Sequence, residues 1–82
     1  MLSKELLLEK GFELNNYAEG KYYSLKIRDE ETIQKVLVDD YTGDEESVIL
    51  QLKEDFSEKI ICVDCETWDL KEEDFLEIIN KL

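Results

Sequence analysis

The sequence predicts an α+β fold, in which an antiparallel sheet of four strands is flanked by an N-terminal and a C-terminal helix. Three observations predict it. In residues 47–52 the apolar Val48, Leu50 and Leu52 occupy every second position, as on the buried side of a strand, with Ser47, Ile49 and Gln51 between them. The last residues repeat apolar side chains at helical spacing. No connection is long enough for a parallel crossover, so we expect an antiparallel meander of order α-β-β-β-β-α.

A short helix is predicted at Lys4–Lys10. Ser3 is a suitable N-cap, because its hydroxyl can accept a hydrogen bond from the first turn. Leu2 and Leu7 stand at the two positions of a hydrophobic staple. Gly11 follows where the helix should end, because glycine enters the left-handed conformation freely.

Four segments are predicted as strands, and a short early segment makes a possible fifth. The alternation of the second strand is imperfect, whereas the fourth is apolar on both faces near its centre, which is typical of a central or covered strand. The strands are expected at Lys21–Ile27, Thr32–Val38, Ser47–Leu52 and Lys59–Cys65, and the short fifth at Phe12–Leu14.

The final segment is predicted to be a helix that begins at Asp69. Glu72 lies three residues after this N-cap and completes a capping box. The apolar stripe at helical spacing consists of Phe75, Ile78, Ile79 and Leu82.

Both helices are expected on one face of the sheet, and residues 1–82 are expected to form a single domain. The predicted sheet residues beneath the helices are Tyr23, Leu25, Ile27, Val48, Leu50 and Leu52.

The net charge of −12 is the main compositional clue to function. Residues 1–28 hold five basic and four acidic residues, and residues 29–82 hold five basic and eighteen acidic ones. Such acidity argues against direct binding to DNA, RNA or anionic lipid, because these partners require a basic surface. The longest early apolar run, 6–8, is too short and too acidic for a signal peptide or membrane span, so we expect a cytoplasmic protein.

We expect neither an enzyme nor a cofactor. The chain has no histidine, which removes the commonest general base and most zinc sites. Cys62 and Cys65 form a C-x-x-C within a predicted strand, where we expect reduced, packed thiols and no metal or redox pair. Calcium-loop registers that start at Asp39 or Asp40 lack the required glycine at the sixth position.

Acidic side chains gather in three places, which we interpret as the surface of a protein-binding module with a basic partner. This pattern suits an inhibitor that occupies a nucleic-acid-binding surface of a nuclease or similar protein, as nucleic-acid mimics and mobile-element anti-defence proteins do. The predicted contact residues are Asp39, Asp40, Tyr41, Asp44, Glu45 and Glu46, with Asp29, Glu30, Glu31, Glu72, Glu73 and Asp74 as a second edge.

The alternative function is a homo-oligomeric structural or assembly protein, most simply a homodimer. A sheet covered on one face leaves the other bare, and a large bare apolar face usually meets a partner. The residues expected on that face are Tyr22, Val36, Val38 and Ile49. Trp68 is interpreted as a packing anchor more readily than as a contact residue. A solvated acidic surface with no binding role is the plainest reading of the charge.

Overall fold

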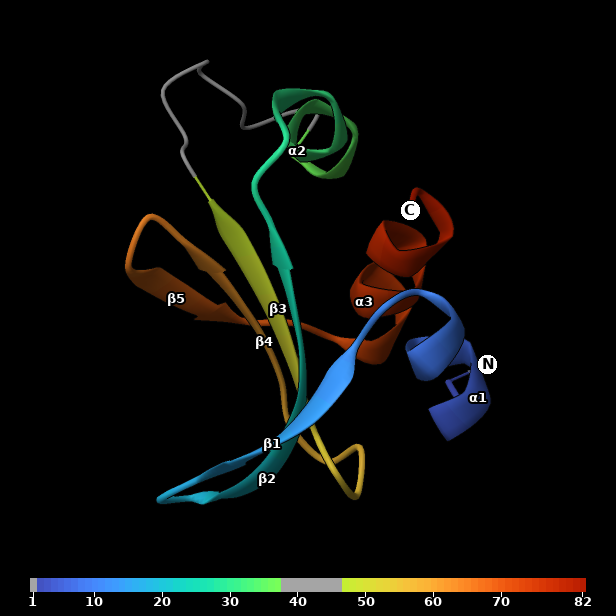
Figure 1. Ribbon diagram of the computed structural model, residues 1–82, viewed down its shortest axis with the longest axis vertical. Helices are drawn as coiled ribbons and strands as arrows, with labels where there is room; N and C mark the ends of the chain where they lie inside the picture. The colour runs from blue at the N-terminus through green and yellow to red at the C-terminus, as the bar shows by residue number, and fades with distance from the viewer. Residues whose placement is uncertain (1, 38–46) are drawn as a thin grey trace.

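A computed structural model describes residues 2–37 and 47–82, and residues 1 and 38–46 lie outside the described part (Figure 1). In the described ranges the sheet has five strands in chain order, with each neighbouring pair antiparallel. This confirms the predicted α+β meander between two terminal helices. The elements are α1 (Lys4–Glu9), β1 (Glu13–Tyr17), β2 (Gly20–Ile27), α2 (Glu30–Val36), β3 (Val48–Lys53), β4 (Lys59–Val63), β5 (Glu66–Asp69) and α3 (Glu72–Asn80).

The ends of α1 follow the predicted local chemistry. The Ser3 hydroxyl accepts a hydrogen bond from the backbone N–H of Leu6 at 3.1 Å. At the other end Gly11 has a φ of +97°, and the N–H of Phe12 donates to the carbonyl of Leu7 at 2.9 Å. Together with the bond from the N–H of Gly11 to the carbonyl of Leu8 at 3.1 Å, the bond from Phe12 to Leu7 forms a Schellman motif. Leu7 and Phe12 are both buried, so the same motif docks this six-residue helix on the core.

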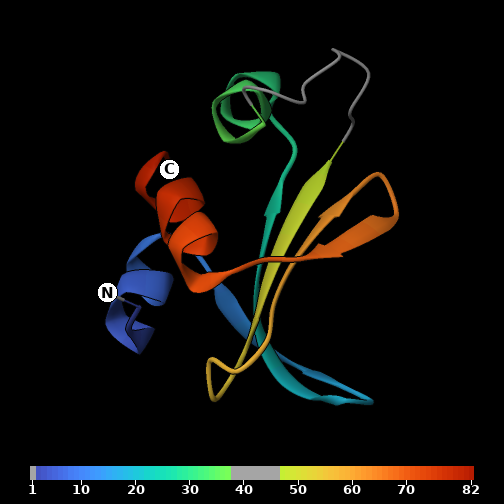
Figure 2. The same ribbon diagram turned by 180° about the vertical axis from the view of Figure 1, so that it is seen from behind.

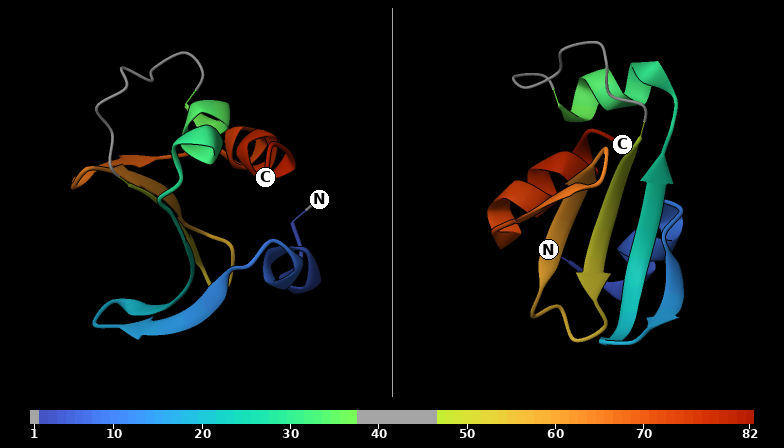
Figure 3. Two further views of the ribbon diagram at one scale, coloured as in Figure 1. Left: turned by 45° about the horizontal axis from the view of Figure 1, so that its top comes forward. Right: turned by 90° about the vertical axis from the view of Figure 1, so that its left-hand side faces the viewer.

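The sheet is curved, and the helices lie on its concave side (Figures 2 and 3). The register aligns Tyr23 with Leu52 and Leu25 with Leu50, and Leu50 in turn with Ile61. These side chains share the face toward the helices, as predicted, and Leu25 alone among the six predicted residues is only half-buried. Phe75 of α3 is fully buried against this layer, 6.1 Å from the ring of Phe12.

The prediction of a strand at Thr32–Val38 is wrong, because Glu30–Val36 forms α2. The imperfect alternation has a helical explanation: Ile33, Val36 and Leu37 stand at i, i+3 and i+4 and turn toward the core. Asp29 caps the helix by accepting from the backbone N–H of Thr32 at 2.9 Å. Tertiary burial and this cap outweigh the strand preference of the β-branched residues.

The end of the fourth predicted strand and the start of the last helix also need correction. β4 stops at Val63, and Asp64 and Cys65 form a tight turn with φ values of +48° and +76°. Residues after this turn form the edge strand β5, in which Asp69 pairs with Ile60 and does not cap a helix. α3 begins at Glu72 after Lys71, whose side chain makes no capping hydrogen bond.

None of the helices in the described ranges, 2–37 and 47–82, has the length and apolar character required to cross a membrane.

Candidate functional site

An apolar groove of about 480 Å³ lies between the helices and the β5 side of the sheet. α2 contributes Val36 and Leu37 at its C-terminal end, and β4 contributes Ile61 and Val63. The remaining lining residues follow β4 in the chain: Trp68 of β5, Leu70 of the link to α3, and Ile78 of α3. Four separate segments therefore build the groove, which we call the C-terminal groove.

Trp68 is the most exposed apolar residue of the C-terminal groove. Its side chain is 49% exposed, although the register aligns it with the buried Ile61 on the helix-facing side. β5 is an edge strand of four residues, and within the described ranges no further strand pairs beyond it. A large aromatic side chain that lies on a strand but is half exposed to solvent is typical of a contact residue. The structure therefore does not support its interpretation as a buried packing anchor.

Acidic side chains run along the chain beside this groove, from β5 into the first turn of α3. Five of the nine residues from 66 to 74 are acidic and all five are exposed, whereas Lys71 is the only basic residue among the nine. We call this set the acidic edge; it consists of Glu66, Asp69, Glu72, Glu73 and Asp74.

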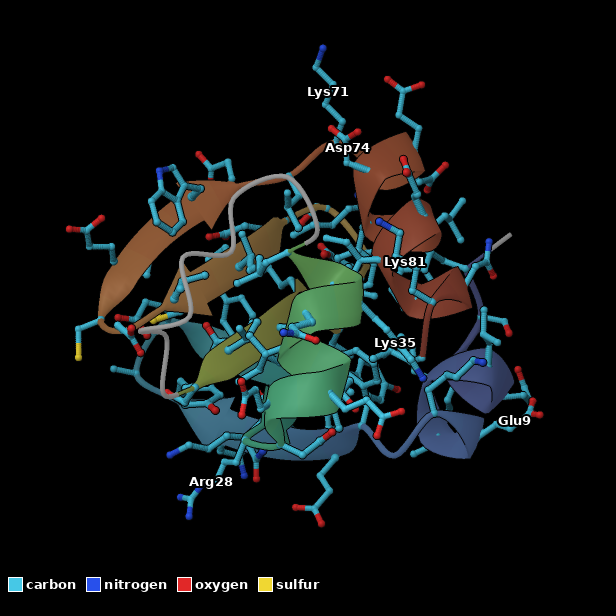
Figure 4. The ribbon with its side chains drawn as sticks, turned by 90° about the horizontal axis from the view of Figure 1, so that it is seen from above. Glu9, Arg28, Lys35, Lys71, Asp74 and Lys81 are labelled. Atoms are coloured by element: carbon cyan, nitrogen blue, oxygen red, sulfur yellow. The ribbon has the colours of Figure 1, made fainter. Side chains whose placement is uncertain are left out.

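Two members of the acidic edge border the C-terminal groove directly. Glu66 lies on the same side of β5 as Trp68 and is aligned with Val63 of the groove wall. Asp74 precedes Ile78 by one turn of α3, so the two side chains are neighbours on the helix surface. Figure 4 shows Lys71 and Asp74 projecting outward at the start of α3. The groove thus has an apolar interior and an anionic margin.

The carboxylates at the start of α2 are engaged in local structure. Asp29 accepts from the backbone N–H and hydroxyl of Thr32, and these hydrogen bonds hold the pKa of its carboxyl below the usual value. Glu31 pairs with Lys35 one turn later, with 3.9 Å between Oε1 and Nζ. Arg28, which precedes this helix, lies on the opposite side of the molecule from Asp74 in Figure 4. The acidic residues at the starts of α2 and α3, which the sequence predicts as one second edge, therefore lie on separate surfaces.

The predicted acidic loop lies outside the described residues. This applies to Asp39, Asp40, Tyr41, Asp44, Glu45 and Glu46, and also to Val38 of the predicted oligomer face.

The sheet face opposite the helices is less apolar than predicted. Val36 is not on it, because α2 turns this residue into the core. Tyr22 is on this face but only 6% exposed, and its hydroxyl donates to Glu58 Oε2 at 3.1 Å. Burial and this hydrogen bond raise the pKa of Tyr22 above its usual value. Ile49 is half-buried, and the ring of Tyr17 meets Tyr22 edge to face at 5.7 Å.

The two cysteines are free thiols, but only one is packed as predicted. Cys62 is half-buried in β4, whereas Cys65 is exposed in the turn before β5. Within the part of the chain that the structure describes, no three histidine, cysteine or acidic side chains converge as metal ligands would.

The sequence predicts the acidic first turn of α3 but not the C-terminal groove. It places Ile78 in the helix stripe and Val63 in a strand, which is correct for each residue alone. Their convergence depends on α2, where the sequence predicts a strand, and on the pairing of β5, for which the sequence predicts no strand. The available signal was Trp68 itself, a large aromatic residue among acidic neighbours in a strand too short to bury it.

Comparison of the chain with known protein families, with curated proteins and with solved structures yields no significant match.

Proposed function

We propose that this chain is an acidic protein-binding module whose acidic edge occupies a basic surface of a partner protein. The observation that carries the proposal is the run of five exposed carboxylates from β5 into α3 with Lys71 as their one basic neighbour in sequence. Among the described residues, Glu72, Glu73 and Asp74 make no ion pair, so their charge is not neutralised internally.

The chemistry of this edge suits a partner that normally binds nucleic acid. Its lysine and arginine side chains would be arranged to hold phosphates, and exposed carboxylates close together in the chain can compete for them. In this account the chain is an inhibitor and nucleic-acid mimic, of the kind that blocks a nuclease or other defence enzyme. Exposed charge of this kind mainly raises the association rate and selects the partner.

A cytoplasmic location belongs to the same proposal. Cys62 and Cys65 are free thiols, and unpaired cysteines are usual in a reducing compartment. An exposed thiol such as that of Cys65 would be prone to oxidation elsewhere.

Affinity capture with three forms of the protein tests the proposal. The edge variant Glu72→Gln/Glu73→Gln/Asp74→Asn removes three negative charges from the acidic edge. The control variant Glu9→Gln/Glu13→Gln/Glu19→Gln removes three from exposed positions elsewhere. We expect the natural chain and the control to retain a basic protein at low salt and release it at high salt, and the edge variant to lose it.

The captured protein should also lose its nucleic-acid binding when the natural chain is added. Retention that does not change between low and high salt would contradict an electrostatic interaction. Equal retention by the edge variant and the control would show that overall charge, and not the acidic edge, selects the partner.

A second candidate function is self-association through the open sheet face near the β1–β2 hairpin. Tyr17 is 42% exposed there and lies between two shallow depressions of about 270 and 390 Å³. Residues 1–28 carry a net charge of only +1, so charge repulsion does not oppose contact at this hairpin. Analytical ultracentrifugation of the natural chain and of a Tyr17 variant tests this function. A dimer that forms at micromolar concentration and depends on Tyr17 would support it, and a monomer at high concentration would exclude it.

A further inference from the structure

The C-terminal groove is an apolar feature that the electrostatic interaction proposed for the acidic edge does not require. Binding to a purely basic surface requires exposed carboxylates, but no apolar depression beside them. The groove nevertheless has a floor of Val36 and Ile61, each 6% exposed, and a wall formed by the half-exposed indole of Trp68. An exposed apolar hollow with a polar margin is typical of a place where a partner side chain is inserted.

The volume and the lining of the groove determine which chemical group can bind in it. Its volume of about 480 Å³ falls in the range of about 300–1,000 Å³ that holds small molecules. Among the residues that the structure describes, its lining is aliphatic and aromatic, and none of these lining side chains has a charge or amide with which to orient a polar ligand. A bulky apolar side chain therefore fits the chemistry of the interior better than a polar metabolite does.

The charge at the margin of the groove determines which partner residues can flank the inserted apolar side chain. Glu66 and Asp74 border the apolar lining, and further carboxylates of the acidic edge lie within a few residues of them. Lys81, which follows Ile78 by three residues, is already paired with Glu77 at 3.9 Å. The margin is therefore net anionic, and it favours cationic residues on either side of the inserted group.

We propose, on the basis of the function proposed above, that the C-terminal groove binds a cationic segment of the partner through one bulky apolar side chain. Lysine or arginine residues of that segment contact Glu66 and Asp74, and its phenylalanine- or leucine-like side chain packs on Trp68. A second copy of this chain is a poor occupant, because its net charge of −12 repels another copy from the acidic edge.

Trp68 makes the test direct, because it is the only tryptophan of the chain and lies in the groove. The probes are two short lysine- and alanine-based peptides, identical in charge, with phenylalanine or alanine at the central position. We expect the phenylalanine peptide to bind about tenfold or more tightly, since it buries one additional aromatic side chain. Its binding should shift Trp68 emission to shorter wavelength, and the alanine peptide should not.

Two variants locate the effect, with affinities measured by calorimetry and folding checked by circular dichroism. Trp68→Ala should abolish the preference for the phenylalanine peptide. Leu8→Ala removes an equally exposed apolar side chain, 49% in both residues, from α1 and outside the groove lining, and should leave the preference unchanged.

The outcomes separate this inference from the function on which it rests. Equal, salt-sensitive binding of both peptides would overturn the groove inference and leave the acidic-edge proposal standing. Failure of both peptides to bind at low salt would overturn the two together. A blue shift of Trp68 emission with protein concentration alone would identify a second copy as the occupant and overturn the inference.

Discussion

The helices α2 and α3 each begin beside three consecutive acidic residues, yet the two sets differ in what they contact. At α2 the carboxylate of Asp29 caps the helix and Glu31 pairs with Lys35. At α3 the N-cap is Lys71, without a side-chain hydrogen bond, and the following carboxylates are exposed. Both sets interact favourably with a helix dipole. The difference indicates that acidic residues at α2 serve folding, whereas those at α3 remain available to a partner.

The comparison requires that buried apolar contacts contribute more to holding both helices than these acidic side chains do. We expect Phe75→Ala in α3 to lower the free energy of unfolding by about 3–5 kcal/mol, because its buried ring leaves a cavity. Ile33→Ala in α2 should lower it by about 2–5 kcal/mol for the same reason. Urea denaturation measures both, and Ile33→Val, at about 0.5–1.5 kcal/mol, is the control.

Loss of either helix through neutralisation of its acidic residues alone, with the apolar anchors intact, would contradict this requirement.

The cap of α2 provides the next largest expected effect. Asp29→Ala should lower the melting temperature at neutral pH, since the N–H of Thr32 loses its acceptor. Lys71→Ala at the corresponding position of α3 should leave it unchanged. Thermal melts of the two variants and the natural chain measure the two shifts in melting temperature. Equal shifts would contradict the conclusion that only α2 is stabilised by its N-cap side chain.

The pH dependence of the Asp29 effect has a definite sign. Hydrogen bonds from Thr32 lower the pKa of Asp29 in the folded state. The stabilisation is therefore fully present above the pKa of the unfolded chain, and it is lost as pH falls through the lower folded pKa. The difference in stability between the natural chain and Asp29→Ala should shrink in acid. Asp29→Asn retains a capping oxygen, so it should preserve much of the stability without this pH dependence.

The smallest expected effect concerns the turn that positions β5 and its part of the acidic edge. Cys65 has a φ of +76°, where a side chain is unfavourable. We expect Cys65→Gly to raise the free energy of unfolding by about 0.5–1 kcal/mol, because glycine adopts this conformation without strain. Cys65→Val should lower it. Urea denaturation checks both, and destabilisation by the glycine variant would show that the thiol makes a stabilising contact.

The parts of the fold that could be predicted from the sequence are those determined by neighbouring residues. Ser3 and Gly11 specify both ends of α1, because capping depends on groups within one turn. β5 could not be predicted in this way, since a four-residue strand is stabilised by pairing with β4 and has little preference of its own. The acidic first turn of α3 depends only on neighbouring residues, and the sequence predicts it. The C-terminal groove cannot be predicted in this way, because α2, β4, β5 and α3 build it together.

The most direct test of the account compares matched neutralisations at the two helices. Glu72→Gln/Glu73→Gln/Asp74→Asn and Asp29→Asn/Glu30→Gln/Glu31→Gln each remove three negative charges, so they share the same net charge. The measurement is the affinity of each variant for the cationic phenylalanine peptide across a range of salt concentrations.

The account predicts that the α3 variant binds about tenfold more weakly at low salt and with a shallower salt dependence, whereas the α2 variant stays within about twofold of the natural chain. Equal weakening of both variants would contradict it, because total charge and not the acidic edge would then determine binding.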